Sequence, residues 1–214
     1  MSEAVVVSTD RSNVIEVVRI GRNLGAEICN LDLSQPLTEN EFAVVHRAFL
    51  EHEVLVLRNQ NIEAPNQLAF GRLFGELSIH PFSPNLDGMP ELIVLDNHRD
   101  NPPRLTDQWH SDETFREAPP MATILRSTIT PSLGGDTMFA SMSAAYEGLS
   151  DEMQHFISGL EGIFDFKPFR TLFGNDEDSK KRLREIEDEH PVRTHPVVRV
   201  HPESGRKSIF VNPQ

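Results

Sequence analysis

The segment QWHSDETF, residues 108–115, places a histidine and an aspartate two positions apart, directly after Trp109, the only tryptophan of the chain. Residues i and i+2 of a β-strand point to the same side, so a strand would direct the His110 imidazole and the Asp112 carboxylate to one point. With a second histidine from elsewhere, such a pair forms the two-histidine, one-carboxylate set that holds non-haem Fe(II). Taken alone, an H-x-D pair is more often structural than metal-binding.

The composition predicts an ordinary globular protein. The chain has 214 residues, of which 38% are hydrophobic and 25% charged, enough for one large domain with a hydrophobic core. Neither an internal repeat nor a low-complexity linker divides the sequence, so we expect a single domain over residues 1–214. The formal net charge of −13 argues against sequence-independent binding to nucleic acid, which requires a basic surface.

Cellular location follows from three features of the sequence. The longest apolar runs, such as residues 54–57, are too short to cross a bilayer, and we expect no membrane partner. The first 13 residues, MSEAVVVSTDRSN, lack the basic flank and apolar core of a secretory signal. Cys29 is the only cysteine, which excludes an intrachain disulfide and suits a reducing compartment. We therefore expect a cytoplasmic protein.

Local patterns predict a chain that starts as alternating strands and helices and continues mostly as β-structure. Thr38 and Glu41 form a capping-box pattern that should begin a helix running to about Glu51. The other predicted elements are strands at 14–20, 54–57, 91–96 and 121–130, a strand after a Gly134–Gly135 turn, helices at 64–77 and within 143–162, and a hairpin at 195–212 with its turn near Ser204–Gly205. This order predicts an α+β, mostly β chain built around antiparallel sheet. The acidic stretch 174–190 is expected to be a solvated helix face or a mobile loop.

Several catalytic patterns are absent from the sequence. It contains no G-x-S-x-G, no G-x-G-x-x-G and no P-loop. The segment HEVLV at 52–56 begins like the helix of a zinc protease, but Val56 stands where the second histidine would be. His110 and Asp112 therefore remain as the candidate site.

Four segments together carry a resemblance to a known family. They are FGELSIHP, WHSDETF, PSLGGDTMFASMSAAYEGLS and HPVVRVHPESGRKSIFVN. In this order they resemble the taurine dioxygenase (TauD/TfdA-like) family of Fe(II)- and 2-oxoglutarate-dependent oxygenases, from about Val14 onward. The resemblance implies a double-stranded β-helix, or jelly roll, with flanking helices.

The resemblance also implies roles for individual residues. His110 and Asp112 match the metal ligands, Thr137 matches a threonine that helps to hold 2-oxoglutarate, and His80 matches a histidine that lines the substrate pocket. The implied reaction uses Fe(II), 2-oxoglutarate and O₂ to hydroxylate a substrate, and releases succinate and CO₂. Trp109 and Phe115, which flank the pair, are expected to pack in the core.

The sequence also departs from the family pattern near its C-terminus. In the family, a second metal-binding histidine and the arginine that pairs with 2-oxoglutarate follow the FVN strand, whereas this chain ends at Gln214. We therefore expect a jelly roll that lacks its C-terminal part, with unpaired strand edges and an open core. His195 and Arg206 lie 11 residues apart, similar to the distal pair. They match a segment that precedes that pair, so we do not expect His195 to bind the metal.

Two further positions bear on the substrate. Ser83 stands near the place where taurine-specific members have a tyrosine, which argues against taurine itself. Arg170 is a candidate partner for an anionic group, although a surface arginine is the more common interpretation.

These observations lead to one hypothesis and two alternatives. The hypothesis is a dioxygenase for a small, anionic organic substrate, such as taurine, another sulfonate, a sulfate ester or a carboxylate, that assembles as a homo-oligomer (dimer or tetramer). One alternative is a catalytically incomplete, truncated jelly roll that acts in an oligomer. The other is a cupin-like metalloenzyme with non-oxidative chemistry at His110 and Asp112.

Overall fold

A computed structural model describes residues 5–7, 14–98, 100–101 and 108–212, without the side chains of residues 5–7, 167 and 168. Backbone contacts group the chain into two compact units, and each is described by itself. The first unit comprises Met1–Ser78, Ile124–Ala144 and His201–Arg206, and the second comprises Ile79–Thr123, Ala145–Val200 and Lys207–Gln214. The prediction of a single domain stays a prediction.

A four-stranded sheet organises the first unit. Its order is β1 (Val5–Val7), β2 (Ile15–Arg19), β3 (Ala26–Cys29) and β4 (Leu55–Val56). The pairs β1–β2 and β2–β3 are antiparallel, whereas β3 and β4 are parallel. Ile15 and Val17 are buried while Glu16 between them is more exposed, which is the alternation expected of a strand with one face on a core. The strands predicted at 14–20 and 54–57 are confirmed.

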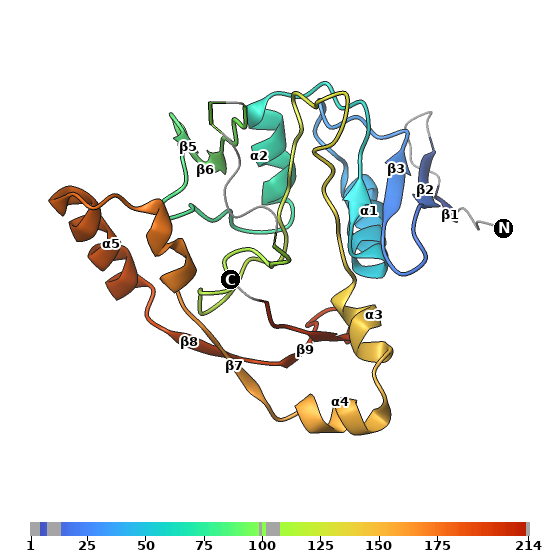
Figure 1. Cartoon of the computed structure of the whole chain (residues 1–214). Coiled ribbons are helices and arrows are strands. Elements are labelled where there is room, and N and C mark those ends of the chain that lie inside the picture. Colours follow the sequence, from blue (N-terminus) through green and yellow to red (C-terminus); the bar gives the residue numbers. More distant parts are fainter. Residues whose placement is uncertain (1–4, 8–13, 99, 102–107, 213–214) are drawn as a thin grey trace. The chain divides into compact units, whose positions relative to one another are not determined.

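Helix α1 (Glu39–His52) covers this sheet and begins where the sequence predicted (Figure 1). The Glu41 carboxylate accepts the Thr38 backbone N–H at 2.7 Å, and the Glu41 N–H donates to Thr38 Oγ1 at 3.3 Å. These bonds satisfy N–H groups that have no partner within the helix, which is why a capping box begins a helix reliably. The helix ends at Glu53, whose φ of +65° is left-handed.

The core of the first unit lies between the sheet and its helices. Helix α2 (Ala64–Arg72) confirms the predicted helix in shorter form, and Leu68 and Phe70 from it are buried. The buried cluster consists of Ile15, Val17, Ala26, Ile28, Leu31, Leu33, Val44, Val45, Ala48 and Phe70. Apolar residues spaced three to four apart on α1 thus meet the inward-facing residues of β2 and β3, which stabilises both elements.

The strands predicted within residues 121–140 are not formed, and that part of the prediction is wrong. The turn at Gly134–Gly135 is present, with φ of +72° and +75°. The backbone on either side of it belongs to neither a strand nor a helix. Ile129 and Leu133 are 91% and 89% exposed. Strands exist only as hydrogen-bonded ladders, and among the described residues no other segment pairs with this one.

The second unit is built from two-stranded antiparallel pairs and helices. The pairs are β5 (Asn85–Leu86) with β6 (Met89–Ile93), β7 (Glu161–Phe164) with β8 (Arg193–Pro196), and β9 (Val198–Val200) with β10 (Lys207–Ile209). The hairpin predicted at 195–212 is therefore confirmed, with Gly205 at φ +70° in its turn. The predicted strand at 91–96 is confirmed in part, as β6 ends at Ile93.

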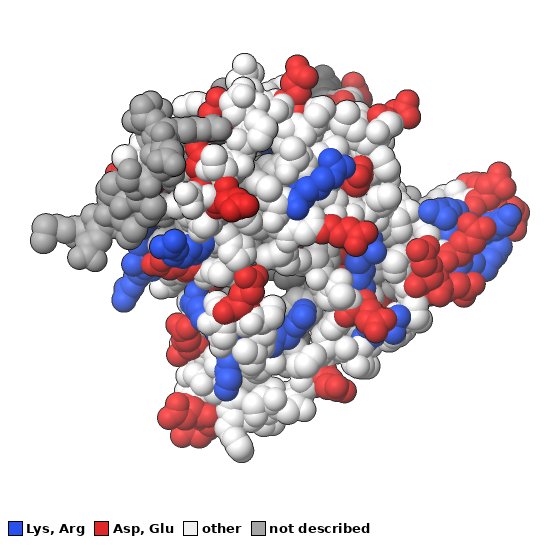
Figure 2. Space-filling model, turned by 180° about the vertical axis from the view of Figure 1, so that it is seen from behind, with Lys and Arg blue, Asp and Glu red and all other residues white. Residues whose placement is uncertain are grey.

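The helices of this part of the chain include the two short ones that the sequence predicted. They are α3 (Met142–Glu147) and α4 (Asp151–Ile157), followed by a 3₁₀ helix at Lys167–Leu172 and by α5 (Glu177–Glu189). Charged side chains of both signs gather on α5, at the right of the space-filling view (Figure 2). The acidic stretch is thus a solvated helix with a buried residue, Ile186. None of the helices in the described ranges is both long and apolar enough to cross a membrane.

Aromatic side chains form the core of the second unit. Phe115, Phe166 and Ile186 are buried, and Phe82, Phe169, Phe173 and Leu183 pack against them. Several of these rings meet edge to face, for example Phe115 and Phe166 with centroids 5.5 Å apart and planes at 90°. This geometry pairs the positive edge of one ring with the negative face of the next. Phe115 therefore joins the QWHSDETF segment directly to the core.

Candidate metal centre

His110 and Asp112 lie in a loop of the second unit, so the prediction that a strand carries them is wrong. Residues 109–111 have no regular structure, and a turn begins at Asp112 and runs to Phe115. Glu113, the second residue of this turn, has φ +49°, a left-handed conformation that ends any extended run. The directions of the His110 and Asp112 side chains are therefore set by a loop and a turn, and not by the alternation of a β-strand.

The two candidate ligand atoms nevertheless converge. His110 Nε2 lies 3.4 Å from Asp112 Oδ1. Two ligands about 2.1 Å from one first-row metal ion, and at right angles to each other, would be about 3.0 Å apart. The pair is therefore close to the spacing that a shared metal ion requires. Both side chains are partly exposed, which leaves the site open to a metal and to a cosubstrate.

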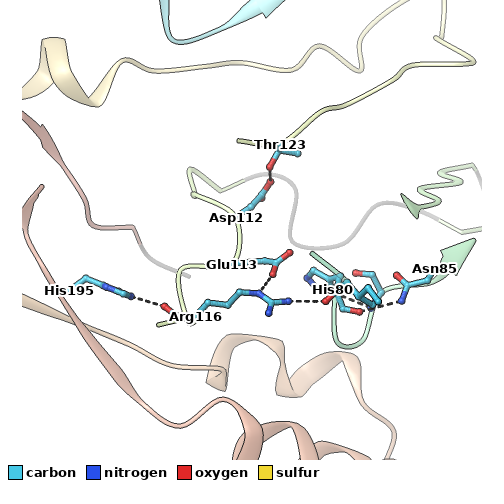
Figure 3. A network of polar contacts seen from close by, with 9 residues as sticks. His80, Asn85, Asp112, Glu113, Arg116, Thr123 and His195 are labelled. Atoms are coloured by element: carbon cyan, nitrogen blue, oxygen red, sulfur yellow. Dashed lines mark hydrogen bonds and ion pairs between the residues drawn. The ribbon is translucent and has the colours of Figure 1, made fainter. Parts of the chain in front are cut away.

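The other polar atom of each side chain already has a partner. His110 Nδ1 donates to the Gln108 carbonyl oxygen at 2.8 Å, because a carbonyl oxygen only accepts. In the tautomer with its hydrogen on Nδ1, the imidazole carries its lone pair on Nε2. Thr123 Oγ1 donates to Asp112 Oδ2 at 2.7 Å, which leaves Oδ1 available (Figure 3). Metal-binding histidines and carboxylates in proteins are oriented by such outer contacts. The arrangement therefore fits two ligands of a divalent metal ion, with lone pairs that face each other.

The bond from Thr123 gives a test of this orientation. Thr123→Val keeps the shape of the side chain and removes the hydroxyl, so the Asp112 carboxylate can rotate away from His110. We expect Mn²⁺ to bind about 10–100-fold more weakly, the usual effect of losing an outer contact. An Mn²⁺ titration followed by electron paramagnetic resonance measures the affinity. Thr130→Val, on the exposed segment, serves as the control, and equal affinity in Thr123→Val and wild type would contradict the role of Thr123.

His80 lies in the same unit, in the loop that follows Ile79. Its Nδ1 accepts the Ser83 backbone N–H at 3.2 Å, so a neutral His80 ring carries its hydrogen on Nε2. The ring packs edge to face on Phe82 with centroids 4.3 Å apart. His80 is thus half-buried and held in one orientation by a hydrogen bond and an aromatic contact.

The surroundings of His80 lower its pKa below the usual value. Burial is the largest cause, and the positive charges of Arg116 and His190 act in the same direction, while Glu113 and Asp112 oppose them. Desolvation disfavours the charged form of a base, which is why burial lowers the pKa. His80 is therefore neutral near pH 7 and presents an N–H donor at Nε2.

Removing the charge of Glu113 should lower the pKa of His80 further, because Glu113 favours the protonated ring. Because the pKa of His80 is lower in the folded chain, the unfolded chain binds a proton at His80 at a higher pH than the folded chain does. The free energy of unfolding should therefore fall as the pH drops below about 6.5. An NMR titration of His80 in wild type and in Glu113→Gln measures the shift. Glu177→Gln, on exposed α5, is the control, and a higher pKa in Glu113→Gln would contradict the assignment.

Arg116 links the turn that follows the pair to the loop of His80. Its side chain forms an ion pair with Glu113, and its Nη2 donates to the Ile79 carbonyl oxygen at 2.8 Å (Figure 3). The structure thus places His80 beside the segment that carries His110 and Asp112. Sequence patterns gave no signal for Thr123 or Arg116, because their bonds to Asp112 and Ile79 join residues 11 and 37 positions apart.

The remaining predicted positions have mixed outcomes. Phe115 is 2% exposed, which confirms its core packing, whereas Trp109 is 56% exposed and that prediction is wrong. Trp109 precedes the pair in an irregular loop, where residues 108–112 are all exposed. Thr137 is exposed in the first unit, and its role toward 2-oxoglutarate stays a prediction. Arg170 forms an ion pair with Glu187 of α5, as a surface arginine would.

A third metal ligand is not found near the pair. Within the described ranges, no group of three or more His, Cys, Asp or Glu side chains is arranged to hold a metal ion. His195 is buried, and its Nε2 contacts the backbone carbonyl oxygens of Thr114 and Arg116. A nitrogen that donates to carbonyl groups has no lone pair for a metal, so His195 Nε2 is not a ligand atom in this arrangement. That His195 does not bind the metal stays a prediction.

Comparisons with known proteins match almost the whole chain. The model of the family described as "Taurine catabolism dioxygenase TauD, TfdA family" covers residues 16–214. An alpha-ketoglutarate-dependent sulfate ester dioxygenase of Pseudomonas putida is 32% identical over 213 residues, which is 98% of this chain and 70% of that protein. An alkylsulfatase of Acinetobacter baylyi is 33% identical over 204 residues, which is 92% of this chain and 62% of that protein.

A solved structure agrees with the sequence matches. The crystal structure of a taurine dioxygenase from Burkholderia xenovorans superimposes with a TM-score of 0.75 at 32% identity, over 93% of this chain and 63% of that one. The chain thus spans 62% to 70% of the lengths of these relatives. Its fold and its matches are those of dioxygenases, several of which depend on alpha-ketoglutarate, the compound also called 2-oxoglutarate. The chain belongs to the TauD/TfdA family, and the predicted resemblance is confirmed.

Proposed function

We propose that the protein is an Fe(II)- and 2-oxoglutarate-dependent dioxygenase that hydroxylates a small organic anion, with a sulfate ester as the favoured substrate class. The observation that carries the proposal is the orientation of His110 and Asp112, whose free ligand atoms converge while their other atoms are held by Gln108 and Thr123.

Each residue of the proposed site would have a separate role. His110 Nε2 and Asp112 Oδ1 bind the metal, and the Gln108 carbonyl and Thr123 hydroxyl keep these two atoms facing it. An Fe(II) ion held there, with 2-oxoglutarate and O₂ as cosubstrates, would supply the oxidation that gives the hydroxylated product, succinate and CO₂. By resemblance to the family, the Thr137 hydroxyl would donate to the cosubstrate.

His80 favours an anionic substrate. Its neutral ring keeps the Nε2–H available, and an oxygen of a sulfate, sulfonate or carboxylate accepts such a hydrogen bond. Two relatives at 32% and 33% identity are named for sulfate esters or alkyl sulfates. By resemblance to the family, Ser83 stands near the place where taurine-specific members have a tyrosine. Together these points support an alkyl sulfate over taurine.

The test separates the metal site from the substrate. Adding Fe(II) and 2-oxoglutarate to the protein without oxygen should produce the weak visible charge-transfer band of the iron chelate. With oxygen, an alkyl sulfate should raise succinate formation more than taurine does, and hydroxylation beside the ester oxygen should release inorganic sulfate. Absence of the band with the complete gene product would reject the proposed function. A band with faster turnover of taurine would reject only the substrate class.

The same experiment addresses the two alternatives. A catalytically incomplete domain would bind neither Fe(II) nor 2-oxoglutarate and would show no band. A cupin-like enzyme with non-oxidative chemistry would bind the metal but would form no succinate. The homo-oligomer expected from the family and the cytoplasmic location remain predictions.

A further inference from the structure

We propose that His195 is a positioning residue, which holds the turn that directs Asp112 toward His110. The inference rests on the proposed function, because it concerns the same metal pair. His195 lies on β8, far from this pair in sequence, and it is one of the few buried polar residues in the described ranges. Neither the metal ligation nor the substrate contact proposed above uses it.

Aromatic packing fixes the orientation of the His195 ring. The side chain is 7% exposed, and its ring lies edge to face against Phe164 at 5.2 Å and Phe210 at 5.5 Å between centroids. Because β8 pairs with β7 through Gly162 and His195, the backbone of His195 is fixed as well. The ring therefore has little freedom, and its Nε2 points in one direction.

That direction is toward the turn after the metal pair. His195 Nε2 lies 3.0 Å from the Thr114 carbonyl oxygen. It also lies 3.0 Å from the Arg116 carbonyl oxygen, the contact that Figure 3 draws. Carbonyl oxygens only accept, so Nε2 carries a hydrogen and shares it between the two. An imidazole N–H between two carbonyl groups is a structural clamp, and its loss would leave buried acceptors without this partner.

The clamped turn needs outside support. The backbone of Glu113 has a left-handed conformation. This conformation is energetically unfavourable for a residue with a side chain and persists only where its surroundings stabilise it. Within the turn, the Arg116 N–H donates to the Glu113 carbonyl oxygen at 3.1 Å, and the side chains of the two residues form an ion pair. His195 on β8 supports the turn from another element, in addition to the packing of Phe115 and the bond from Arg116 to Ile79. Because Asp112 begins this turn, a relaxed turn would move its carboxylate away from His110.

Two substitutions separate the hydrogen bond from the packing. His195→Phe keeps a flat ring between Phe164 and Phe210 but has no N–H, whereas His195→Gln places an amide N–H₂ where Nε2 was. We expect His195→Phe to bind Mn²⁺ about tenfold more weakly, an effect comparable to that of an outer contact. His195→Gln should recover most of this loss. Both affinities are measured by an Mn²⁺ titration followed by electron paramagnetic resonance, at a temperature well below the melting temperature of each variant.

A second readout does not depend on the metal. In the metal-free protein, hydrogen exchange of the backbone amides of residues 113–117 should be faster in His195→Phe than in wild type and slow again in His195→Gln. Ile186→Val, a change in the aromatic cluster of Phe115 that leaves the His195 hydrogen bonds intact, controls for lower overall stability and should leave the Mn²⁺ affinity unchanged.

The outcomes are distinguishable. Weaker Mn²⁺ binding and faster exchange in His195→Phe, both reversed in His195→Gln, support the proposal. If wild type binds Mn²⁺ and His195→Phe binds it equally well, or if Ile186→Val loses as much affinity, the positioning role of His195 is overturned. If wild type itself does not bind Mn²⁺, the proposed function fails, and the role of His195 toward a metal fails with it.

Discussion

His110→Ala is expected to abolish the anaerobic Fe(II)–2-oxoglutarate band, and Asp112→Ala should do the same. Each change removes one of the two ligand atoms that lie 3.4 Å apart, and no third ligand among the described residues compensates. The loss of metal affinity should exceed the roughly 10–100-fold effect of removing an outer contact. Optical titration with Fe(II) under argon, together with an Mn²⁺ titration, measures this loss.

A matched control keeps this result specific. His155 is an exposed histidine on α4, and His155→Ala makes the same chemical change away from the pair. It should leave the band and the Mn²⁺ affinity unchanged. If His110→Ala retained the band at the wild-type Fe(II) concentration, the pair would be structural and another set of residues would hold the metal.

Phe115→Ala is expected to lower the free energy of unfolding by about 3–5 kcal/mol, the usual cost of removing a large buried ring. Phe115 is 2% exposed and contacts Phe166 at 5.5 Å and His190 at 5.1 Å between ring centroids. Its removal deletes apolar contacts and leaves a cavity that the neighbouring rings cannot fill without moving. Denaturant unfolding followed by circular dichroism measures the change.

The control for this substitution is Phe156→Ala. Phe156 is 68% exposed on α4, so its replacement should change the free energy of unfolding by no more than about 0.5 kcal/mol. Because Phe115 ends the turn that begins at Asp112, Phe115→Ala should also weaken Mn²⁺ binding. Equal stabilities of the two variants would contradict the placement of Phe115 in the aromatic core.

The elements that depend on neighbouring residues were predictable from the sequence. The capping box of Thr38 and Glu41 began α1 as expected, because its hydrogen bonds join residues only three positions apart. Gly205 formed the turn of the β9–β10 hairpin, since glycine adopts positive φ without a steric cost. Strands β2 and β4 were predicted from their apolar residues.

The elements that depend on distant partners were not predictable in the same way. Residues 121–140 have the composition of strands, but a strand requires a ladder of hydrogen bonds to a neighbour, which composition does not specify. Strands β7 and β8 were not predicted, because their own sequences do not indicate strands. Each is stabilised by pairing with the other across about 30 residues of sequence. Trp109 was assigned to the core because aromatic residues that flank a strand usually pack there, whereas residues 108–112 form no strand and are exposed.

For the candidate site, the chemical identity of the ligands could be inferred from residue types, and their geometry could not. His110 and Asp112 are two positions apart, and that spacing with its family context indicated an iron pair before any coordinates were known. The outer partner Thr123, the neighbouring His80 and the clamp from His195 come from other segments, and only folding brings them to the pair. Local spacing determines which ligands the chain offers, whereas long-range hydrogen bonds and packing determine whether their lone pairs meet.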